Sequence, residues 1–374
     1  MTDDAPPEPD CAPDAPHPRQ TARLIGQEQA EAEFLNAFTS DHLHHAWMIT
    51  GPQGVGKATL AWRIARFLLA TSVPQTGRMF DIADAPTTSL DIADDHPIVH
   101  RLKALSEPRL FLLRRAWDAD KERLKTVINV DEVRRLKSFF SLSATDGGRR
   151  VVIVDAVDEL NMNAANALLK LLEEPPADTV MLLVSHQPAR LLPTVLSRCR
   201  TLRCKALNPD EMAAALAQAG SDPGPDTPAL TALAGGSVGA AKRLISLDGL
   251  AIYAEIVALF TGPLDRPRAL RLAESAVGRN AVTRLDLMLD LFDLFLARLA
   301  RAGLTGPADL QAAPGEALMQ AQLAPSAAAS RRWAELAQHL GARARHGRAV
   351  NLDPAALILD MVLKIHETAA KLPA

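Results

Sequence analysis

The sequence predicts an α/β domain, in which helices cover both faces of a parallel sheet, followed by an all-helical region. Short apolar runs at residues 46–49, 151–154 and 180–184 alternate with helical patterns, as in consecutive βαβ units. A glycine-rich turn directly follows the first run, and strand patterns fade beyond Asn208. We therefore expect a tail, an α/β domain, a small helical domain and a helical bundle, at residues 1–20, 21–207, 208–248 and 249–374.

Composition narrows the class of protein. Of the 374 residues, 48% are apolar and 23% charged, which is ordinary globular usage. The formal charge of −3 gives no chain-wide basic footprint, so any contact with DNA has to be local or shared with other subunits. No apolar run reaches the roughly 18 residues of a membrane helix. With three cysteines and no secretory signal pattern, the chain is expected in the cytoplasm, without membrane contact.

Two segments lack a core-forming pattern. Residues 1–20 combine six prolines with five acidic residues, which predicts a disordered tail, with a peptide docking motif as the alternative. Residues 73–125 contain four prolines and are predicted to be an irregular insert.

The remaining elements follow from periodicity and end signals. Asp131 is a plausible N-cap, Pro175 and Pro176 stop a helix, and Asp353-Pro354 marks the start of the last helix. Helices are expected from residue 27 and at 57–69, 131–142, 164–174 and 191–196, with a short strand at 201–204.

The glycine-rich turn is a phosphate-loop candidate. Gly51, Gly54, Gly56 and Lys57 fit the pattern G-x-x-x-x-G-K. In such a loop, backbone N–H groups cradle phosphate oxygens, the following helix adds a positive dipole end, and the lysine reaches the β- and γ-phosphates. A coincidental glycine turn is the alternative, but the apolar run before the turn and the helical pattern after it favour the phosphate loop.

The loop lacks the groups that hold and use magnesium. The position of the Mg²⁺-binding hydroxyl is occupied by Ala58, and Thr59 is turned away by about 100° on a helix. The strand at 151–154 ends in Asp155, which can hold the Mg²⁺ shell, but Ala156 stands where an ATPase has a second carboxylate. Asp158 and Glu159 are substitutes only if they are not part of a solvated acidic loop.

These motifs, with two further runs, resemble the clamp-loader branch of the AAA+ proteins. The first run is N-A-L-L-K-L-L-E-E-P-P at residues 166–176, and the second is the triplet Ser197-Arg198-Cys199. Their order and spacing are specific, and the resemblance covers about residues 24–205. It implies an AAA+ P-loop domain, with residues 208–248 as the lid and residues 249–374 as the collar that joins subunits.

Within that branch, the pattern of losses resembles a subunit that is not a motor. Motor subunits carry Ser or Thr at the position of Ala58, Glu at that of Ala156, and a lid arginine where Gly239 follows Gly236-Ser237-Val238. Lys242 and Arg243 are the candidate replacements for that arginine. The retained Arg198 implies an arginine that completes the ATP site of a neighbouring subunit, whereas residue chemistry alone suggests a surface arginine at a helix C-terminus.

The resemblance also implies partners and cofactors. The partners would be the gamma and tau motor subunits, the delta subunit, and, through the complex, the sliding clamp and primed DNA. No cofactor would be required, and weak ATP or ADP binding without Mg²⁺-dependent turnover is expected. The family's four-cysteine zinc module has no counterpart at residues 59–150, so no metal is expected, and Cys199 and Cys204 are interpreted as buried or partly buried thiols. An active motor and a phosphotransferase for small substrates are the alternatives.

Overall fold

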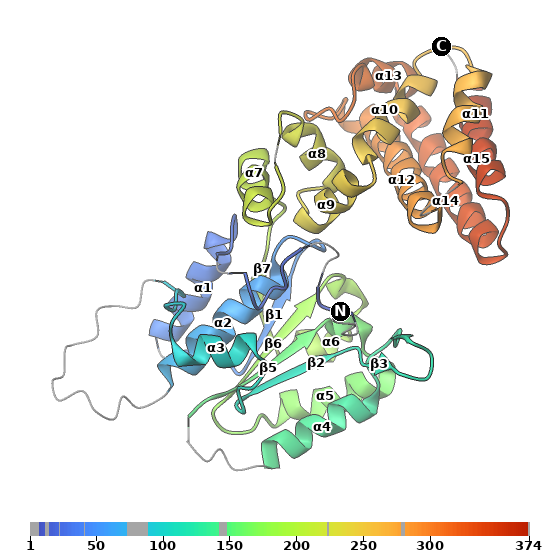
Figure 1. Ribbon diagram of the computed structural model, residues 1–374. Helices are drawn as coiled ribbons and strands as arrows, with labels where there is room; N and C mark the ends of the chain where they lie inside the picture. Colours follow the sequence, from blue (N-terminus) through green and yellow to red (C-terminus); the bar gives the residue numbers. More distant parts are fainter. Residues whose placement is uncertain are drawn as a thin grey trace, which may run out of the picture. The chain divides into compact units, whose positions relative to one another are not determined.

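The computed structural model describes residues 7–11, 15–21, 23–40, 42–72, 89–141, 148–222, 224–277 and 281–372. The chain divides into two compact units (Figure 1). One comprises residues 1–219 with 237–239, and the other residues 220–236 with 240–374. The finer division into lid and collar stays a prediction.

The first unit contains a five-stranded parallel sheet in the order β2-β5-β6-β1-β7. The two central strands β1 and β6 are buried along their whole length, because helices cover both faces. The predicted α/β fold is therefore confirmed. The strands are β1 (Ala46–Thr50), β2 (Leu110–Arg114), β5 (Arg150–Asp155), β6 (Thr179–Ser185) and β7 (Arg200–Arg203).

Each face of the sheet has its own apolar core. On one face, Trp62 and Phe67 of α2 pack with α1 and with alternate residues of the strands. On the other, Leu136 of α4 and Leu168 of α5 pack with the intervening strand residues. Figure 1 shows α1 and α2 on one side of the sheet and α4 and α5 on the other. The covering helices are α1 (Glu28–Thr39), α2 (Lys57–Thr71), α3 (Pro97–Lys103), α4 (Val130–Ser141), α5 (Met162–Glu173) and α6 (Pro193–Leu196), and helix α7 (Pro209–Gln218) follows β7 at the end of this unit.

The prediction of an irregular insert at residues 73–125 is wrong for residues 89–125. Residues 89–125 contain α3, the edge strand β2 and a hairpin of β3 (Trp117–Asp118) and β4 (Arg123–Leu124), while residues 73–88 lie outside the described residues. Pro97 occupies the first turn of α3, where a proline starts a helix instead of breaking it. Helix α4 begins at Val130, so Asp131 lies in its first turn and is not its N-cap.

The predicted tail is partly described. Residues 1–6 and 12–14 lie outside the described residues. Residues 7–11 and 15–20 contact the α/β unit, where the His17 side chain is buried and Arg19 donates to the Lys103 carbonyl.

The second unit is helical, as predicted, and its bundle is centred on α12 and α14. Trp333, Phe292, Phe295 and Tyr253 are fully buried in it. Helix α15 begins at the predicted signal, because Asp353 accepts a hydrogen bond from Ala356 N. The helices are α8 (Thr227–Ala234), α9 (Val238–Ser246), α10 (Gly249–Leu259), α11 (Arg266–Glu274), α12 (Ala281–Thr305), α13 (Glu316–Leu323), α14 (Ala327–Ala349) and α15 (Pro354–Ala369).

None of the helices in the described part of the chain is both long and apolar enough to cross a membrane.

Candidate functional site

The glycines of the phosphate loop stand where any side chain would collide. Gly51 and Gly54 both have positive φ, and a Cβ atom would lie 2.4 Å from the Cys204 carbonyl oxygen at Gly51 and 2.3 Å from Ser237 Oγ at Gly54. Gly56, also with positive φ, precedes the first residue of α2. The backbone therefore requires glycine at the positions where the phosphate-loop pattern has it. The loop joins the end of β1 to the N-terminus of α2.

Lys57 is folded back onto its own loop. Its ammonium group donates to the carbonyl oxygen of Gly51 at 2.8 Å and to that of Pro52. Burial lowers the pKa of Lys57 to about 8, although the nearby Cys204, Asp155 and Asp158 oppose the shift. The lysine is thus a buried, desolvated cation next to a loop of the kind that binds phosphate.

Asp155 ends strand β5 and is almost fully buried. Burial, reinforced by the negative charges of Asp10 and Glu159, raises its pKa to about 7, and Lys57 and Arg114 only partly offset this. Because carboxyl ends of parallel strands meet at one sheet edge, Asp155 and Lys57 lie where open α/β sheets bind ligands.

Asp158 and Glu159 are engaged in contacts within the chain. The Asp158 carboxylate accepts hydrogen bonds from Ser185 Oγ at 2.8 Å and from the backbone N–H groups of His186 and Gln187. Glu159 forms an ion pair with Arg115 at 2.8 Å. The alternative of a solvated acidic loop is therefore wrong for both residues. Neither has the free carboxylate that a replacement for a water-orienting glutamate needs.

His186 is a site residue that sequence reasoning missed. It directly follows β6, and burial, together with the charge of Lys57, lowers its pKa to about 4, so the ring is neutral at physiological pH. The available signal was its position two residues beyond the apolar run at 180–184, at the carboxyl end of a parallel strand.

Arg198 lies on the surface at the end of α6, with about a third of its side chain exposed. Its guanidinium pairs with Glu173 at 2.9 Å and donates to the Thr194 carbonyl at 2.9 Å. Glu173 ends helix α5, so the two sequence runs that carry the resemblance meet through this ion pair. The contact with Thr194 is the helix-end contact that residue chemistry alone suggests.

The rest of the triplet supports α6. Ser197 Oγ donates to the Thr194 carbonyl at 3.1 Å. Cys199 is partly buried and Cys204 is buried, and burial raises the pKa of each thiol to about 12. Both are poor metal ligands in this environment, and their burial confirms the interpretation as buried or partly buried thiols. Ala58 and Thr59, in the first turn of α2, are half-buried.

The lid candidates have partners inside the helical unit. Arg243 pairs with Asp290 at 2.7 Å, and Lys242 donates to Ser221 Oγ at 3.3 Å. Residues 237–239 cluster with the first unit, where Val238 N donates to the Gly54 carbonyl at 3.0 Å. Among the described residues, no group of three or more His, Cys, Asp or Glu side chains could hold a metal ion.

Residues 26–208 match the family model described as "DNA polymerase III, delta subunit". This segment, just under half of the chain, is therefore similar to that family. It contains the phosphate loop, Asp155 and Arg198, and the match confirms the resemblance inferred from the motifs.

Individual relatives agree with the family match. A Pseudomonas aeruginosa protein named DNA polymerase III subunit delta′ is 40% identical over 209 residues, which cover 54% of this chain and 55% of the relative. The Bacillus subtilis subunit delta′ is 29% identical over 46% of each chain. The Escherichia coli subunit tau is 27% identical over 70% of this chain and 39% of its own length.

The match to the delta′ relatives spans only about half of their length. A solved structure of a gamma subunit-related protein from Thermotoga maritima covers 90% of this chain and 99% of its own, with 14% identity and a TM-score of 0.37. At that score the likeness carries no argument about fold or function, and the fold rests on the sheet order itself.

Proposed function

We propose that this protein is a delta′ subunit of a DNA polymerase III clamp loader. It acts as a non-motor stator and supplies Arg198 to the ATP site of a neighbouring gamma or tau subunit. The complex, which also contains delta, uses ATP to load the sliding clamp on primed DNA during chromosomal replication in the cytoplasm. The chain itself performs no nucleotidyl transfer.

The observation that carries the proposal is an asymmetry within the α/β unit. The groups for hydrolysis in cis are absent, because Ala58 has no hydroxyl for Mg²⁺ and Ala156 has no carboxylate for water. Arg198, by contrast, is retained and is partly exposed on the surface. An arginine that cannot serve a complete site in its own chain is most useful to the site of a neighbour.

The chemistry of Arg198 suits that role. A planar guanidinium matches the oxygens of a transferring phosphoryl group, and such an arginine contributes about 10³–10⁵ in rate in other NTPases. Its present partner, Glu173, is about two-fifths exposed, so the ion pair is a weak one that a phosphate can replace. Glu173 thus holds the arginine until a neighbour's nucleotide presents stronger negative charge.

The same geometry supports weak nucleotide binding without turnover. The loop backbone is formed, and Lys57 has only two loop carbonyls to give up. Calorimetry with ATP and with ADP tests this, and heat that disappears in Lys57→Ala is the expected result. No heat with either nucleotide would remove this part of the proposal. The expectation that the chain holds no zinc is checked by metal analysis of the same sample.

The decisive experiment compares Arg198→Ala with the wild-type chain in a loader reconstituted from motor subunits, delta, clamp and primed DNA. Arg190→Ala is the matched control, because Arg190 is an exposed arginine eight residues upstream. With assembly verified by gel filtration, the expected result is a large loss of DNA-stimulated ATPase and of clamp loading for Arg198→Ala alone.

Two results would contradict the proposal. Unchanged ATPase in an intact Arg198→Ala complex would make the arginine structural. ATP hydrolysis by the isolated chain, abolished in Lys57→Ala, would favour the alternative of an active motor subunit.

A further inference from the structure

Strand β2 is an exposed edge of the parallel sheet. Among the described residues it pairs only with β5, and four of its five residues are half-buried, whereas β1 and β6 are buried throughout. The outer edge of such a strand offers backbone N–H and C=O groups that an extended peptide can pair with. Edge strands are often protected by charged side chains, so the surroundings of β2 decide what can approach it.

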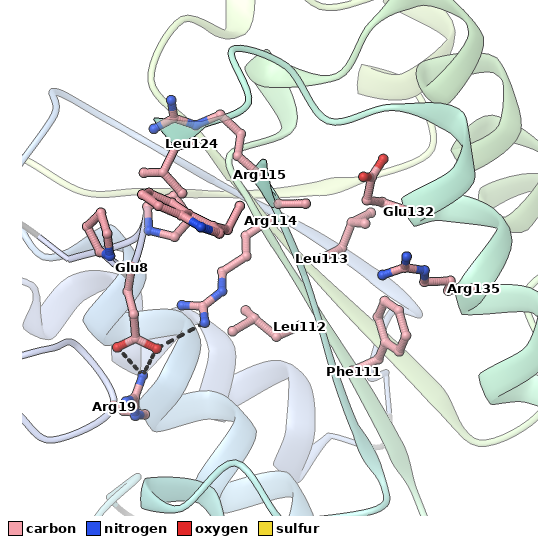
Figure 2. A pocket seen from close by; sticks show the side chains of 14 residues that line it. Glu8, Arg19, Phe111, Leu112, Leu113, Arg114, Arg115, Leu124, Glu132 and Arg135 are labelled. Atoms are coloured by element: carbon pink, nitrogen blue, oxygen red, sulfur yellow. Dashed lines mark hydrogen bonds and ion pairs between the residues drawn. The ribbon is translucent and has the colours of Figure 1, made fainter. Parts of the chain in front are cut away.

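An arginine-rich pocket of about 700 Å³ lies along this strand. It is lined by residues 111–115, by the β3–β4 hairpin through Trp117 and Leu124, and by Arg135 of α4. Arg114, Arg115, Arg135 and Arg19 contribute four cations to its lining. The carboxylates that face them are Glu8 and Glu132 in the lining, Asp10 on Arg114 and Glu159 on Arg115. Glu8 and Asp10 belong to the N-terminal segment. Without that segment this pocket, called here the β2 pocket, combines an apolar floor with an excess of positive charge that favours an acidic ligand (Figure 2).

Part of the N-terminal segment forms one wall of the β2 pocket. Figure 2 shows the Glu8 carboxylate between Arg19 and Arg114, and it accepts hydrogen bonds at 2.7 Å and 2.8 Å from the first and at 2.9 Å from the second. Asp10, whose side chain is fully buried, also pairs with Arg114. Burial alone would raise the pKa of Glu8, but the hydrogen bonds from Arg114 and Arg19 outweigh it and hold that pKa below its usual value.

The segment is held in two different ways. Residues 15–21 are fixed through the backbone, because Arg66 of α2 donates to the carbonyl oxygens of Arg19 and Thr21. Residues 7–10 are held by carboxylates on Arg114 and Arg19. Pro7 and Pro9 have no N–H group, so this stretch cannot donate a regular ladder of hydrogen bonds to β2. An acidic peptide without prolines could make the same ion pairs and add the ladder.

We propose that the β2 pocket is a docking site for an acidic, extended peptide of a partner protein, which residues 7–10 cover within the same chain. Glu8 and Asp10 are two residues apart, which is the spacing that places side chains on one face of a strand. They mark the places of two partner carboxylates on Arg114 and its neighbours. The partner displaces the acidic stretch while residues 15–21 stay bound to α2. This inference does not depend on the proposed function.

The test uses the full chain and a labelled peptide, acetyl-AEVDV-amide, which keeps the Glu and Asp spacing and removes the prolines. Binding is measured by fluorescence anisotropy at low salt. In the variant Glu8→Gln/Asp10→Asn, residues 7–10 have lost their negative charges and compete less well with the peptide for the arginines. This variant is expected to bind the peptide about tenfold tighter than the wild type, which corresponds to about 1.4 kcal/mol. The neutral peptide acetyl-AQVNV-amide is expected not to bind.

Two further substitutions, each added to the Glu8→Gln/Asp10→Asn variant, locate the site. Arg135→Gln removes a pocket arginine, and Arg134→Gln removes its exposed neighbour on α4, which does not line the pocket. Only Arg135→Gln and Arg114→Gln should weaken peptide binding. Because Arg114→Gln could disturb the fold, its thermal unfolding is compared first, and Arg135→Gln keeps the test decisive if Arg114→Gln is unstable.

Three outcomes would overturn the proposal. Equal affinity of the wild type and of Glu8→Gln/Asp10→Asn for the acidic peptide would show that residues 7–10 do not cover a peptide site. Equal effects of Arg134→Gln and Arg135→Gln would reduce binding to general charge attraction. Binding of ATP in place of the peptide, lost in Arg114→Gln, would make the pocket an anion site for nucleotide.

Discussion

Two buried clusters of charged residues in this chain differ in how far their hydrogen bonds are satisfied. In the helical unit, Glu316 is fully buried and accepts five hydrogen bonds, from Tyr253, Arg298 (two), Gln320 and the Ala312 N–H. In the α/β unit, Asp155 is almost as deeply buried, but its pKa is raised to about 7, and the nearby Lys57 donates to loop carbonyls instead.

The difference separates a structural network from a binding site. A carboxylate with every lone pair occupied fixes the elements around it, and removing it exposes all of its partners at once. A carboxylate that is buried without such partners costs free energy in the empty protein and becomes favourable only when a ligand supplies positive charge or protons. The following predictions test this contrast, beginning with the largest expected effect.

Glu316→Gln should strongly destabilise the helical unit. The substitution leaves the Arg298 guanidinium buried with its principal partner neutralised, and breaking a buried pair costs about 3–5 kcal/mol. Urea unfolding followed by circular dichroism measures the change. Glu335→Gln, at an exposed position on α14, is the control and should change the free energy of unfolding by less than about 0.5 kcal/mol. Similar changes in the free energy of unfolding for the two variants would show that the Glu316 network does not stabilise the helical unit.

Asp155→Asn should raise the free energy of unfolding, in contrast to Glu316→Gln, and the size of this effect should depend on pH. The folded-state pKa of about 7 lies above the ordinary value of 3.8, so the stability of the wild type is greatest at low pH and is lost as the pH rises toward 7. An amide does not ionise. The variant should therefore gain about 2 kcal/mol relative to the wild type between pH 5 and pH 8.

The measurement is the urea midpoint at several pH values, with the exposed Asp120→Asn as control. A stability difference between Asp155→Asn and the wild type that stays constant with pH would contradict the raised pKa.

Tyr253→Phe should cost about 1 kcal/mol, because Glu316 loses one of its five donors and keeps the others. Tyr253 is the only tyrosine of the chain, and burial next to Glu316 raises the pKa of its phenol. In the wild type, phenolate absorbance on raising the pH should therefore appear together with unfolding. Phenolate formation in the folded chain would show that the network is open to solvent.

Glu173→Gln should be the mildest change. The pair with Arg198 is partly exposed, so its loss should cost less than about 1 kcal/mol of stability. In a reconstituted loader the variant should retain ATPase activity, because the guanidinium is still present and is freed from its partner. Glu174→Gln, at the adjacent exposed position, is the control. A loss as large as that of Arg198→Ala would mean that Glu173 positions the arginine for its role.

The sequence predicted the central part of the sheet and missed its edge. Strands β1, β5 and β6 are buried on both faces and read as continuous apolar runs. The edge strand β2 carries Arg114 and is half-buried, so its pattern is weaker and its surroundings contain prolines. Local sequence also located the phosphate loop, whereas the contacts that hold Asp158 and His186 come from segments far apart in the chain.

The sequence by itself determined the buried strands of the sheet, the glycines of the phosphate loop, the missing hydroxyl and carboxylate at Ala58 and Ala156, and the start of the last helix. These are properties of a few adjacent residues, set by sterics, chemistry and periodicity. The tertiary structure decided that Arg198 pairs with Glu173, that Lys57 bonds to its own loop, and that the acidic residues near the N-terminus lie on Arg114. Those pairings join residues up to 106 positions apart, and only packing determines which charges share one buried site.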